Sequence, residues 1–377
     1  MTSFLRAVAL GTLAFLIAGC GSKMQPSIAC TQALPVEFAY MLGSSSNSTA
    51  VSMFTINSCT GAFTAMTPAT VSTSVGPGQQ GAEDMVVDPL GRFVYVANLI
   101  SNSAPNQATI AMFTVNSSTG ILTPTNPPTV PTGFLPQAIA IDPAGKFVYT
   151  ANSDDNTVSM FTVNASTGVL TPTTPASVAA GRSPNFLTVH PSGKFLYVIN
   201  QDDFTVSMYT IDPNTGVLSP ATPATVSSAG GDFGITVDPS GKFAYAVSNF
   251  FNSVTTFSVD STTGVLTQTG TVAVGQGPTA IALDPTGKFA YVTNRVDNTL
   301  SLFNVNPVNG SLTPNVPATI PTGSHPFQIQ FDPARRFVYV VNEESPASIF
   351  SMNTNGTLNF MGMTGSGALS LAITAGK

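Results

Sequence analysis

The chain has 377 residues, of which 43% are hydrophobic and only 8% are charged, and its formal net charge is −6. This composition excludes an intrinsically disordered chain, which would be poor in hydrophobic residues and rich in charge. The acidic balance, with 12 Lys and Arg residues in all, also argues against a nucleic-acid partner and against a basic membrane-binding surface.

Residues 1–20 have the features of a signal peptide rather than of a folded segment. Arg6 supplies a positive charge, and residues 8–17 form an apolar stretch that is too short to span a membrane. The segment from Leu16 to Cys20 (LIAGC) resembles a bacterial lipobox, so we expect Cys20 to be lipidated. The alternative is an ordinary signal peptide with an incidental cysteine. Gly21 follows Cys20 in place of Asp, which by resemblance to the Gram-negative sorting rule favours the outer membrane.

Residues 21–35 are interpreted as a linker that precedes the folded domain, residues 36–377. Cys30 lies in this linker, and Cys59 lies in the first repeat. An even pair of cysteines in an exported chain is typical of a disulfide, so we expect Cys30 and Cys59 to be bonded. The alternative is two free, buried thiols.

A repeat of about 48 residues covers the rest of the chain, which is the period range of repeat architectures. The segment that begins at Pro136 (PQAIAIDPAGKFVYTANSDDNTVSMFTV) matches the segment that begins at Pro278 almost position for position. Its Asp-Pro anchor recurs along the chain, with His190 in the same position of one repeat. The six anchors are Asp88, Asp142, His190, Asp238, Asp284 and Asp332.

A seventh copy is divided between the two ends of the chain. Residues 37–40 and 51–57 match the second and third strand signals of the repeat, but nothing before them matches the first. That missing strand is found at residues 368–373 (ALSLAI). Ring closure explains this division, because the last strand of the chain then completes the first blade. We therefore predict an all-β fold, a seven-bladed β-propeller with four antiparallel strands per blade, closed by the C-terminal strand.

The strand signals also predict which strand of each blade lines the channel. Residues 146–149 (KFVY) are apolar on both faces, as in a strand packed between two neighbours. The fourth strand carries Pro172 and Pro175, and proline is largely confined to sheet edges. We therefore place the fourth strand at the outer rim and the P-x-x-I-A-I strand, residues 136–141, at the central channel. The intervening Asp-Pro-x-Gly segments are typical of type I turns.

Residues 291–294 spell YVTN, and the consensus P-x-x-I-x-x-D-P-x-G-K-F-x-Y-V-x-N extends from about residue 35 to the end of the chain. The consensus resembles the YVTN-repeat propellers and the bacterial lactonase family, which includes 6-phosphogluconolactonase-like enzymes. The resemblance implies a seven-bladed propeller and, in the enzymatic members, a Pro-Arg-His sequence on an inner strand with a Glu after Y-V-x-N of the next strand. The family is thought to bind and process the lactone with this Arg and His.

The catalytic positions that the resemblance implies hold other residues in this chain. In the best register, residues 181–190 (GRSPNFLTVH), Asn185 occupies the Arg position, Phe186 the His position and Gln201 the Glu position. No other blade restores the Arg-His pair, and only Glu343 retains the Glu. This departure weakens the expectation of lactonase activity.

Other polar residues are candidates for chemistry. We expect Glu83 and Asp84 to belong to an inner strand, where two carboxylates can act as acid and base, bind a cation or simply hydrate the channel. If the protein is an enzyme, the candidate catalytic residues are Glu83, Asp84, Arg182, His325 and Glu343. Channel residues expected to bind a ligand are Glu83, Asp84, Gln137, Asn185 and Gln328. We expect His190 to be a turn residue and the pairs Asp154-Asp155 and Asp202-Asp203 to be solvated.

These observations favour a cell-envelope lipoprotein whose propeller binds a small molecule, glycan or envelope protein without catalysis. The alternative is a lactone hydrolase that resembles 6-phosphogluconolactonase. No zinc spacing, calcium loop or phosphate loop is present in the sequence, so we expect no metal and no cofactor. We expect a monomer that is exported, has no nucleic-acid partner and contacts the membrane only through its N-terminal lipid.

Overall fold

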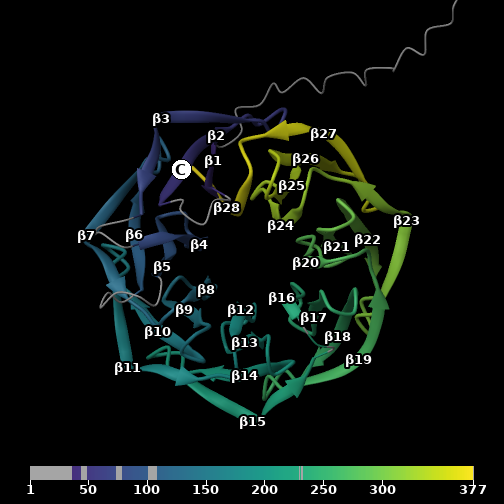
Figure 1. Ribbon diagram of the computed structural model, residues 1–377, viewed down its shortest axis with the longest axis horizontal. Coiled ribbons are helices and arrows are strands. Elements are labelled where there is room, and N and C mark those ends of the chain that lie inside the picture. Colours follow the sequence, from purple (N-terminus) through teal and green to yellow (C-terminus); the bar gives the residue numbers. More distant parts are fainter. Residues whose placement is uncertain are drawn as a thin grey trace, which may run out of the picture. The chain divides into compact units, whose positions relative to one another are not determined.

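A computed structural model describes residues 36–43, 49–73, 79–100, 108–228, 230 and 232–376, and in these residues every regular element is a β-strand. The strands form seven four-stranded antiparallel sheets that are arranged as blades around a central channel (Figure 1). The predicted seven-bladed propeller is therefore confirmed. Cys20 and Cys30 lie outside the described residues, so lipidation and the disulfide stay predictions. No helix in the described part of the chain meets the length and hydropathy needed to cross a membrane.

The four strands of a blade run in order from the channel to the outer rim. Blade 1 is β28 (Ala368–Ala375), β1 (Glu37–Gly43), β2 (Ala50–Ile56) and β3 (Phe63–Ser72); blade 2 is β4 (Gln79–Val87), β5 (Phe93–Ile100), β6 (Thr109–Val115) and β7 (Leu122–Pro131); blade 3 is β8 (Pro136–Ile141), β9 (Phe147–Asn152), β10 (Thr157–Val163) and β11 (Leu170–Ala179); blade 4 is β12 (Pro184–Val189), β13 (Phe195–Asn200), β14 (Thr205–Ile211) and β15 (Leu218–Ser227). Blade 5 is β16 (Asp232–Val237), β17 (Phe243–Ser248), β18 (Ser253–Val259) and β19 (Leu266–Ala273); blade 6 is β20 (Pro278–Leu283), β21 (Phe289–Asn294), β22 (Thr299–Val305) and β23 (Leu312–Pro321); blade 7 is β24 (Pro326–Phe331), β25 (Phe337–Asn342), β26 (Ala347–Met352) and β27 (Leu358–Thr364).

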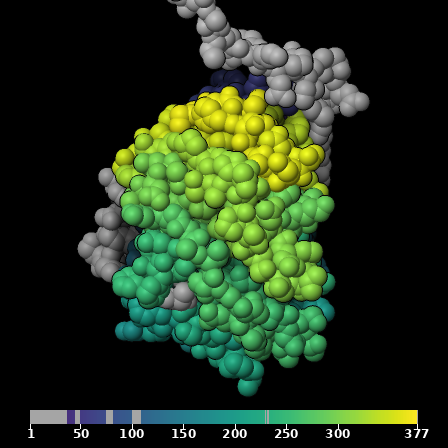
Figure 2. All heavy atoms as spheres, turned by 90° about the vertical axis from the view of Figure 1, so that its right-hand side faces the viewer, coloured from purple at the N-terminus to yellow at the C-terminus, as the bar shows by residue number. Residues whose placement is uncertain are grey.

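The ring closes as the divided repeat predicts. Strand β28 pairs antiparallel with β1 over Glu37 to Gly43, so the end of the chain supplies the innermost strand of the first blade. The inner strands of adjacent blades then contact one another around the channel, including β24 with β28 and β28 with β4. In the side view the blades follow one another in chain order, from teal through green to yellow (Figure 2).

The Asp-Pro-x-Gly segments form the predicted turns between the first and second strands. In blade 3 the N–H of Gly145 donates to the carbonyl of Asp142 at 2.9 Å, and a carboxylate oxygen of Asp142 accepts from Phe147 N–H at 2.7 Å. His190 takes the same role in blade 4, where its Nδ1 accepts from the N–H of Ser192 at 3.0 Å. Its Nε2 donates to the carbonyl of Gly241 at 2.8 Å, which also connects blade 4 to blade 5. His190 is thus a turn residue, as expected.

The tyrosine and the turn glycine of the repeat join each blade to the next. The hydroxyl of Tyr149 in blade 3 donates to the carbonyl of Gly216, in the turn between the third and fourth strands of blade 4, at 3.0 Å. All seven blades make this bond, at 2.7–3.0 Å, through the pairs Tyr40–Gly120, Tyr95–Gly168, Tyr149–Gly216, Tyr197–Gly264, Tyr245–Gly310, Tyr291–Gly356 and Tyr339–Gly61. Because the last pair joins blade 7 to blade 1, the closure uses the same contact as every other interface.

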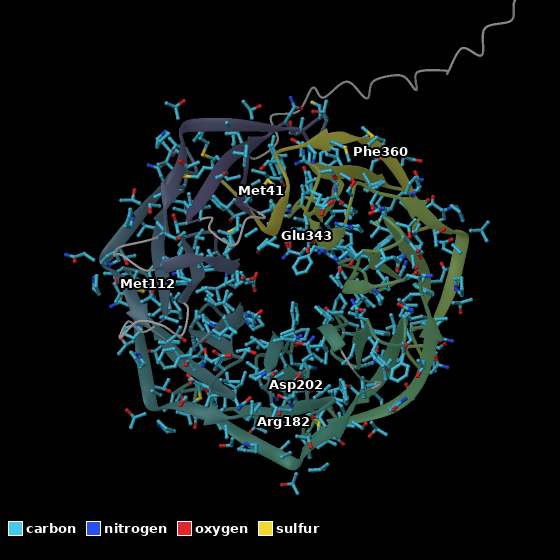
Figure 3. The ribbon with its side chains drawn as sticks, viewed as in Figure 1. Met41, Met112, Arg182, Asp202, Glu343 and Phe360 are labelled. Atoms are coloured by element: carbon cyan, nitrogen blue, oxygen red, sulfur yellow. The ribbon has the colours of Figure 1, made fainter. Side chains whose placement is uncertain are left out.

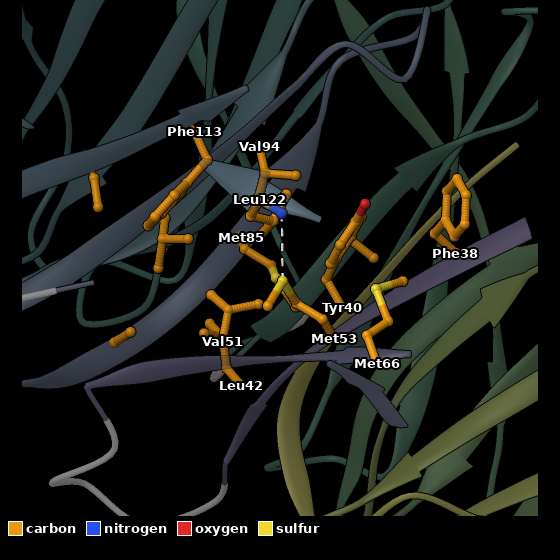
Figure 4. Packing of buried hydrophobic residues seen from close by; sticks show 14 residues of the cluster. Phe38, Tyr40, Leu42, Val51, Met53, Met66, Met85, Val94, Phe113 and Leu122 are labelled. Atoms are coloured by element: carbon orange, nitrogen blue, oxygen red, sulfur yellow. Dashed lines mark hydrogen bonds between the residues drawn. The ribbon is translucent and has the colours of Figure 1, made fainter. Parts of the chain in front are cut away.

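Hydrophobic side chains fill the spaces between neighbouring blades (Figure 3). Figure 4 shows one such cluster, in which Phe38, Tyr40 and Met53 of blade 1 pack against Phe113 and Leu122 of blade 2. The second strand of each blade is buried on both faces, as its sequence predicted; β9 and β13 are examples with every residue buried. The proline-containing fourth strands, such as β11, form the outer edge of their sheets.

Candidate functional site

One end of the channel, which we call the upper mouth, is formed where the inner strands begin. Each inner strand starts opposite the end of the second strand, since Pro136 of β8 pairs with Asn152 of β9. The loops between second and third strands therefore surround this end, together with the loops that enter each inner strand. Figure 3 places Glu343, which directly follows β25, beside the central opening.

A β-bulge near the start of the inner strands sets the side chains of the upper mouth. The register shifts by one residue at Glu83 in β4, at Gln137 in β8 and at Asn185 in β12. The bulged residue has no ladder partner, and bulges commonly redirect a side chain beside a functional site. Phe233 and Phe327 occupy the equivalent positions of β16 and β24. These are the positions that the family resemblance assigns to the catalytic Arg.

Glu83, Gln137 and Asn185 come from three consecutive blades, whose inner strands lie side by side. The Glu83 carboxylate is half-buried and has no hydrogen-bond or ion-pair partner among the described residues. Burial raises the pKa of the Glu83 carboxyl above its ordinary value of 4.5. A carboxylate that is both unpaired and more basic than usual is able to take a proton from water.

Asp84, the next residue, is held by the fold instead. Its two carboxylate oxygens accept from the N–H of Ile139 in blade 3 at 3.1 Å and from the hydroxyl of Ser370 in blade 1 at 2.9 Å. Asp84 therefore joins the inner strands of three blades. Burial raises the pKa of the Asp84 carboxyl to about 6, although these hydrogen bonds oppose the shift.

Gln328 has a similar structural role on the other side of blade 1. Its side-chain oxygen accepts from the N–H of Leu371 in β28 at 2.7 Å. It therefore connects the inner strand of blade 7 to that of blade 1, and its oxygen is occupied. Of the five channel residues expected to bind a ligand, Asp84 and Gln328 are thus committed to contacts between blades.

The remaining catalytic candidates are paired with other charged residues and are not brought together. Arg182 binds Asp203 at 2.6 Å and is 68% exposed; Figure 3 places Arg182 and Asp202 farther from the opening, over blade 4. Glu343 accepts from Arg295 of blade 6 at 2.6 Å, and His325 lies 3.0 Å from Glu344. The five candidates therefore do not form one constellation, and Glu83 is the one that retains an unpaired charged group.

The acidic loop residues are more than solvated side chains. The carboxylates of Asp155, Asp203 and Asp297 accept from the N–H of Phe134, Arg182 and Gln276, at 2.6–2.7 Å. Each aspartate thereby fixes the loop that enters the inner strand of its own blade. The sequence showed this aspartate at the same repeat position, but its recurrence was interpreted as solvation of the hairpin rather than as a hydrogen bond to the loop.

Two other features were also missed in the sequence. Arg295 follows Asn294 as Glu343 follows Asn342, so aligning the repeats would have suggested their contact across neighbouring blades. Three exposed phenylalanines, Phe204, Phe250 and Phe251, lie at positions where blade 3 carries polar loop residues. No group of three or more His, Cys, Asp or Glu residues able to hold a metal ion occurs in the described part of the chain.

Comparison with known proteins identifies the fold family. A family model described as lactonase, 7-bladed beta-propeller, matches residues 35–179, 174–232 and 235–368. A candidate 6-phosphogluconolactonase from Bacteroides uniformis is 23% identical, with a TM-score of 0.74 over 90% of this chain and 99% of that one. The periplasmic gluconolactonase of Pseudomonas aeruginosa is 19% identical, with a TM-score of 0.73 over 90% and 100% of the two chains. These similarities between structures concern the fold. No curated protein sequence matches the chain.

Proposed function

The chain belongs to the lactonase family of seven-bladed β-propellers, and from this premise we propose that it hydrolyses a lactone at the upper mouth of its channel. The observation that carries the proposal is the unpaired, half-buried carboxylate of Glu83 at the bulge of β4. In blade 2, Glu83 occupies the repeat position that holds a catalytic side chain in another blade of the enzymatic family members. Hydrolysis of an ester needs a base to activate water and donors for the developing oxyanion.

In the proposed reaction Glu83 accepts a proton from a water molecule as the water oxygen attacks the lactone carbonyl carbon. The carbonyl oxygen gains negative charge, and we assign the side-chain amide of Gln137, at the equivalent bulge of the next blade, as the donor to it. Collapse of the tetrahedral intermediate breaks the ring C–O bond, and protonated Glu83 returns its proton to the leaving alkoxide. The product is an open-chain hydroxy acid, and no redox step or cofactor is required.

The test is turnover by the protein lacking residues 1–20 on sugar lactones, phosphosugar lactones and simple alkyl lactones. We expect Glu83→Gln to lower kcat/KM about 100-fold or more, as for the loss of a general base. Glu344→Gln is the matched control, because Glu344 is an exposed carboxylate that pairs with His325 and takes no part in the proposed step. Absence of turnover on every lactone would overturn the proposed function. Turnover that Glu83→Gln leaves unchanged would overturn the role of Glu83.

A second candidate is a binding protein without catalysis. It is favoured by the residues in the best register of the family motif, where Asn185 and Phe186 replace the Arg and His and Gln201 replaces the Glu. Phe186 packs against the hydrophobic clusters on both sides of blade 4, so it has a structural role. Under this alternative the upper mouth binds a small molecule, a glycan or an envelope protein. Saturable binding of an unreacted lactone by the wild-type protein, with no hydrolysis, would support it.

We also infer that the protein is exported and anchored by a lipid at Cys20, and that it acts as a monomer in the envelope, with the outer membrane as its expected location. The support is in the sequence: Arg6, the apolar residues 8–17 and the lipobox-like residues 16–20. Labelling with a palmitate analogue in a bacterial host is expected for the full chain and not for Cys20→Ser. Equal labelling of both would contradict the anchor. Mass spectrometry without reduction tests the proposed bond between Cys30 and Cys59.

A further inference from the structure

Three phenylalanines form an exposed aromatic patch on the end of the propeller that carries the upper mouth. Phe204 lies in the loop after β13, and Phe250 and Phe251 lie in the loop after β17. They are 51%, 75% and 59% exposed, and the rings of Phe250 and Phe251 make an edge-to-face contact with centroids 5.0 Å apart. Exposed aromatic side chains grouped in this way mark a surface that binds an apolar group.

Phe204 occupies a position that is asparagine in blades 3, 5 and 6. Its φ of 54° lies in the left-handed region, as do Asn156, Asn252 and Asn298 at the same position of other blades, with φ of 50–55°. Asparagine tolerates this conformation, whereas a bulky side chain is strained in it. Each of these asparagines also accepts a backbone N–H of the next loop, at 2.7–2.8 Å, which phenylalanine cannot do. Strained backbone conformations of this kind cluster at functional sites.

Phe251 likewise replaces a structural residue, the aspartate that binds a loop N–H in blades 3, 4 and 6. The two replacements flank the same connection, between blades 4 and 5. A Cβ on Gly230 in that connection would lie 3.0 Å from the ring of Phe251 and 3.5 Å from the ring of Phe204, so both rings lie beside this glycine. Phe233, the bulged residue of β16 at the upper mouth, follows three residues later. The loop that contacts the aromatic patch therefore leads directly into an inner strand at the mouth.

The charges at this end of the molecule disfavour an anionic ligand. The acidic residues in the described loops at this end are Asp154, Asp155, Asp202, Asp203, Asp297, Glu343 and Glu344. The arginines in the same described loops, Arg182 and Arg295, are each paired with one of these carboxylates. The exposed lysines of the repeat, such as Lys146 and Lys194, lie at the opposite end of the second strands. A negative field at the mouth opposes approach of a phosphate or carboxylate.

We propose that the substrate is an uncharged lactone that carries an alkyl chain, with the lactone ring at Glu83 and Gln137 and the chain extending along Phe233 to the aromatic patch. This inference rests on the proposed function and specifies its substrate class. The unpaired carboxylate of Glu83 supplies the base, and the phenylalanines of the patch remove the alkyl chain from water. Both arginines in the described loops are already paired, so a phosphorylated lactone would find no counter-charge there.

The first test compares δ-decalactone with δ-valerolactone, which differ only in the alkyl chain, and with glucono-δ-lactone and its 6-phosphate. Burial of methylene groups predicts a kcat/KM about 10- to 100-fold higher for δ-decalactone than for δ-valerolactone. Phe250→Ala/Phe251→Ala is expected to remove most of this ratio by lowering kcat/KM for δ-decalactone. Phe134→Ala is the matched control, since Phe134 is 39% exposed in the loop entering blade 3 and lies outside the patch.

The outcomes separate this inference from the proposed function. If lactones are hydrolysed but δ-decalactone has no advantage, or a phosphosugar lactone is preferred, the substrate class is overturned and the lactonase proposal remains. If no lactone is hydrolysed, the stabilisation of Glu83→Gln protein by each lactone, measured as a rise in Tm, still tests the patch. Equal Tm shifts with δ-decalactone and δ-valerolactone would then overturn it.

A second variant uses the strain at Phe204. Phe204→Asn installs the residue that other blades carry at this backbone conformation, so it is expected to raise Tm. The same variant is expected to lower the ratio of δ-decalactone to δ-valerolactone kcat/KM severalfold. A rise in Tm with an unchanged ratio would show that Phe204 is merely strained and has no part in binding.

Discussion

At the scale of single residues, adjacent carboxylates on one strand have separate roles because their partners differ. Asp84 is bound by Ile139 and Ser370 from two other blades, whereas Glu83 has no partner in the described part of the chain. Burial raises the pKa of both carboxyls. The raised pKa of Asp84 is expected to affect mainly the stability of the protein, and the raised pKa of Glu83 is expected to affect the proposed reaction.

The pH profile of hydrolysis tests Glu83. A general base acts when it is deprotonated, so kcat/KM is expected to fall as pH falls through the pKa of Glu83. Because burial raises that pKa, the acidic limb should have its midpoint above 4.5. Glu83→Gln should abolish the limb along with most of the activity. A midpoint at or below 4.5, or a limb that persists in Glu83→Gln, would contradict the assignment.

The pH dependence of stability tests Asp84. Its pKa is about 6 in the folded protein and near 3.8 when solvated, so the folded state binds the proton more tightly. The free energy of unfolding is therefore expected to decrease as pH rises from about 4 to about 6. Asp84→Asn keeps an oxygen for the N–H of Ile139 and has no charge to desolvate. The decrease in the free energy of unfolding between about pH 4 and about pH 6, measured by urea unfolding, should therefore be smaller in this variant than in the wild type. Asp203→Asn is a control of opposite sign, because Arg182 lowers the pKa of Asp203. An unchanged slope in Asp84→Asn would contradict the prediction.

At the scale of elements, each turn glycine between the third and fourth strands makes two contacts with the preceding blade. The carbonyl of Gly216 accepts a hydrogen bond from the hydroxyl of Tyr149 at 3.0 Å, and the φ of Gly216 is 74°. A Cβ there would lie 2.3 Å from Cδ1 of Phe147, so only glycine fits beneath that ring. This explains why the Gly of the turn and the Phe and Tyr of the second strand recur together.

Gly216→Ala is expected to destabilise the protein by about 2–5 kcal/mol, because it combines an unfavourable φ with overpacking. Gly270→Ala is the matched control, since a Cβ on Gly270 in β19 meets nothing within 4 Å. It should be neutral or stabilising by less than about 1 kcal/mol. Urea unfolding measures both, and equal effects of the two substitutions would rule out this account of the interface.

At the scale of the whole molecule, the contact between blades 7 and 1 joins residues almost 300 positions apart and holds the ring closed. Arg336 binds Glu37, and it also donates to the carbonyl of Ser58 at 2.7 Å. Glu37 is only 1% exposed and replaces the lysine or arginine that the other blades carry at this position. Burial, followed by the charge of Asp332, raises the pKa of the Glu37 carboxyl, and the charge and hydrogen bond of Arg336 oppose this shift.

Arg336→Ala is expected to cost about 3–5 kcal/mol, because it leaves a buried carboxylate without its partner. Glu37→Gln in the Arg336→Ala background should recover part of this loss by removing the charge. A double-mutant cycle in urea measures the coupling. An Arg336→Ala protein as stable as the wild type would show that the ion pair has no part in closure.

The sequence was sufficient for the architecture because each feature of the blade is encoded locally. The Asp-Pro-x-Gly turn, the strand buried on both faces and the prolines of the outer strand each identify an element from its own residues. The divided copy at residues 37–57 and 368–373 predicted the closure, because a strand absent from one end and present at the other has one place in a ring. The same alignment located the bulged position that holds Glu83, Gln137 and Asn185.

Only the tertiary structure decided which of the candidate residues are available for chemistry. Arg295 and Glu343 are 48 residues apart in sequence, and Asp84 and Ser370 are 286 apart, so their contacts exist only when neighbouring blades are packed and the ring is closed. The pKa of Glu83 likewise depends on burial by surrounding blades. The sequence by itself therefore determined the repeat, the ring and the strand that lines the channel, whereas packing between blades determined which charges are paired and left Glu83 as the unpaired one among the candidates.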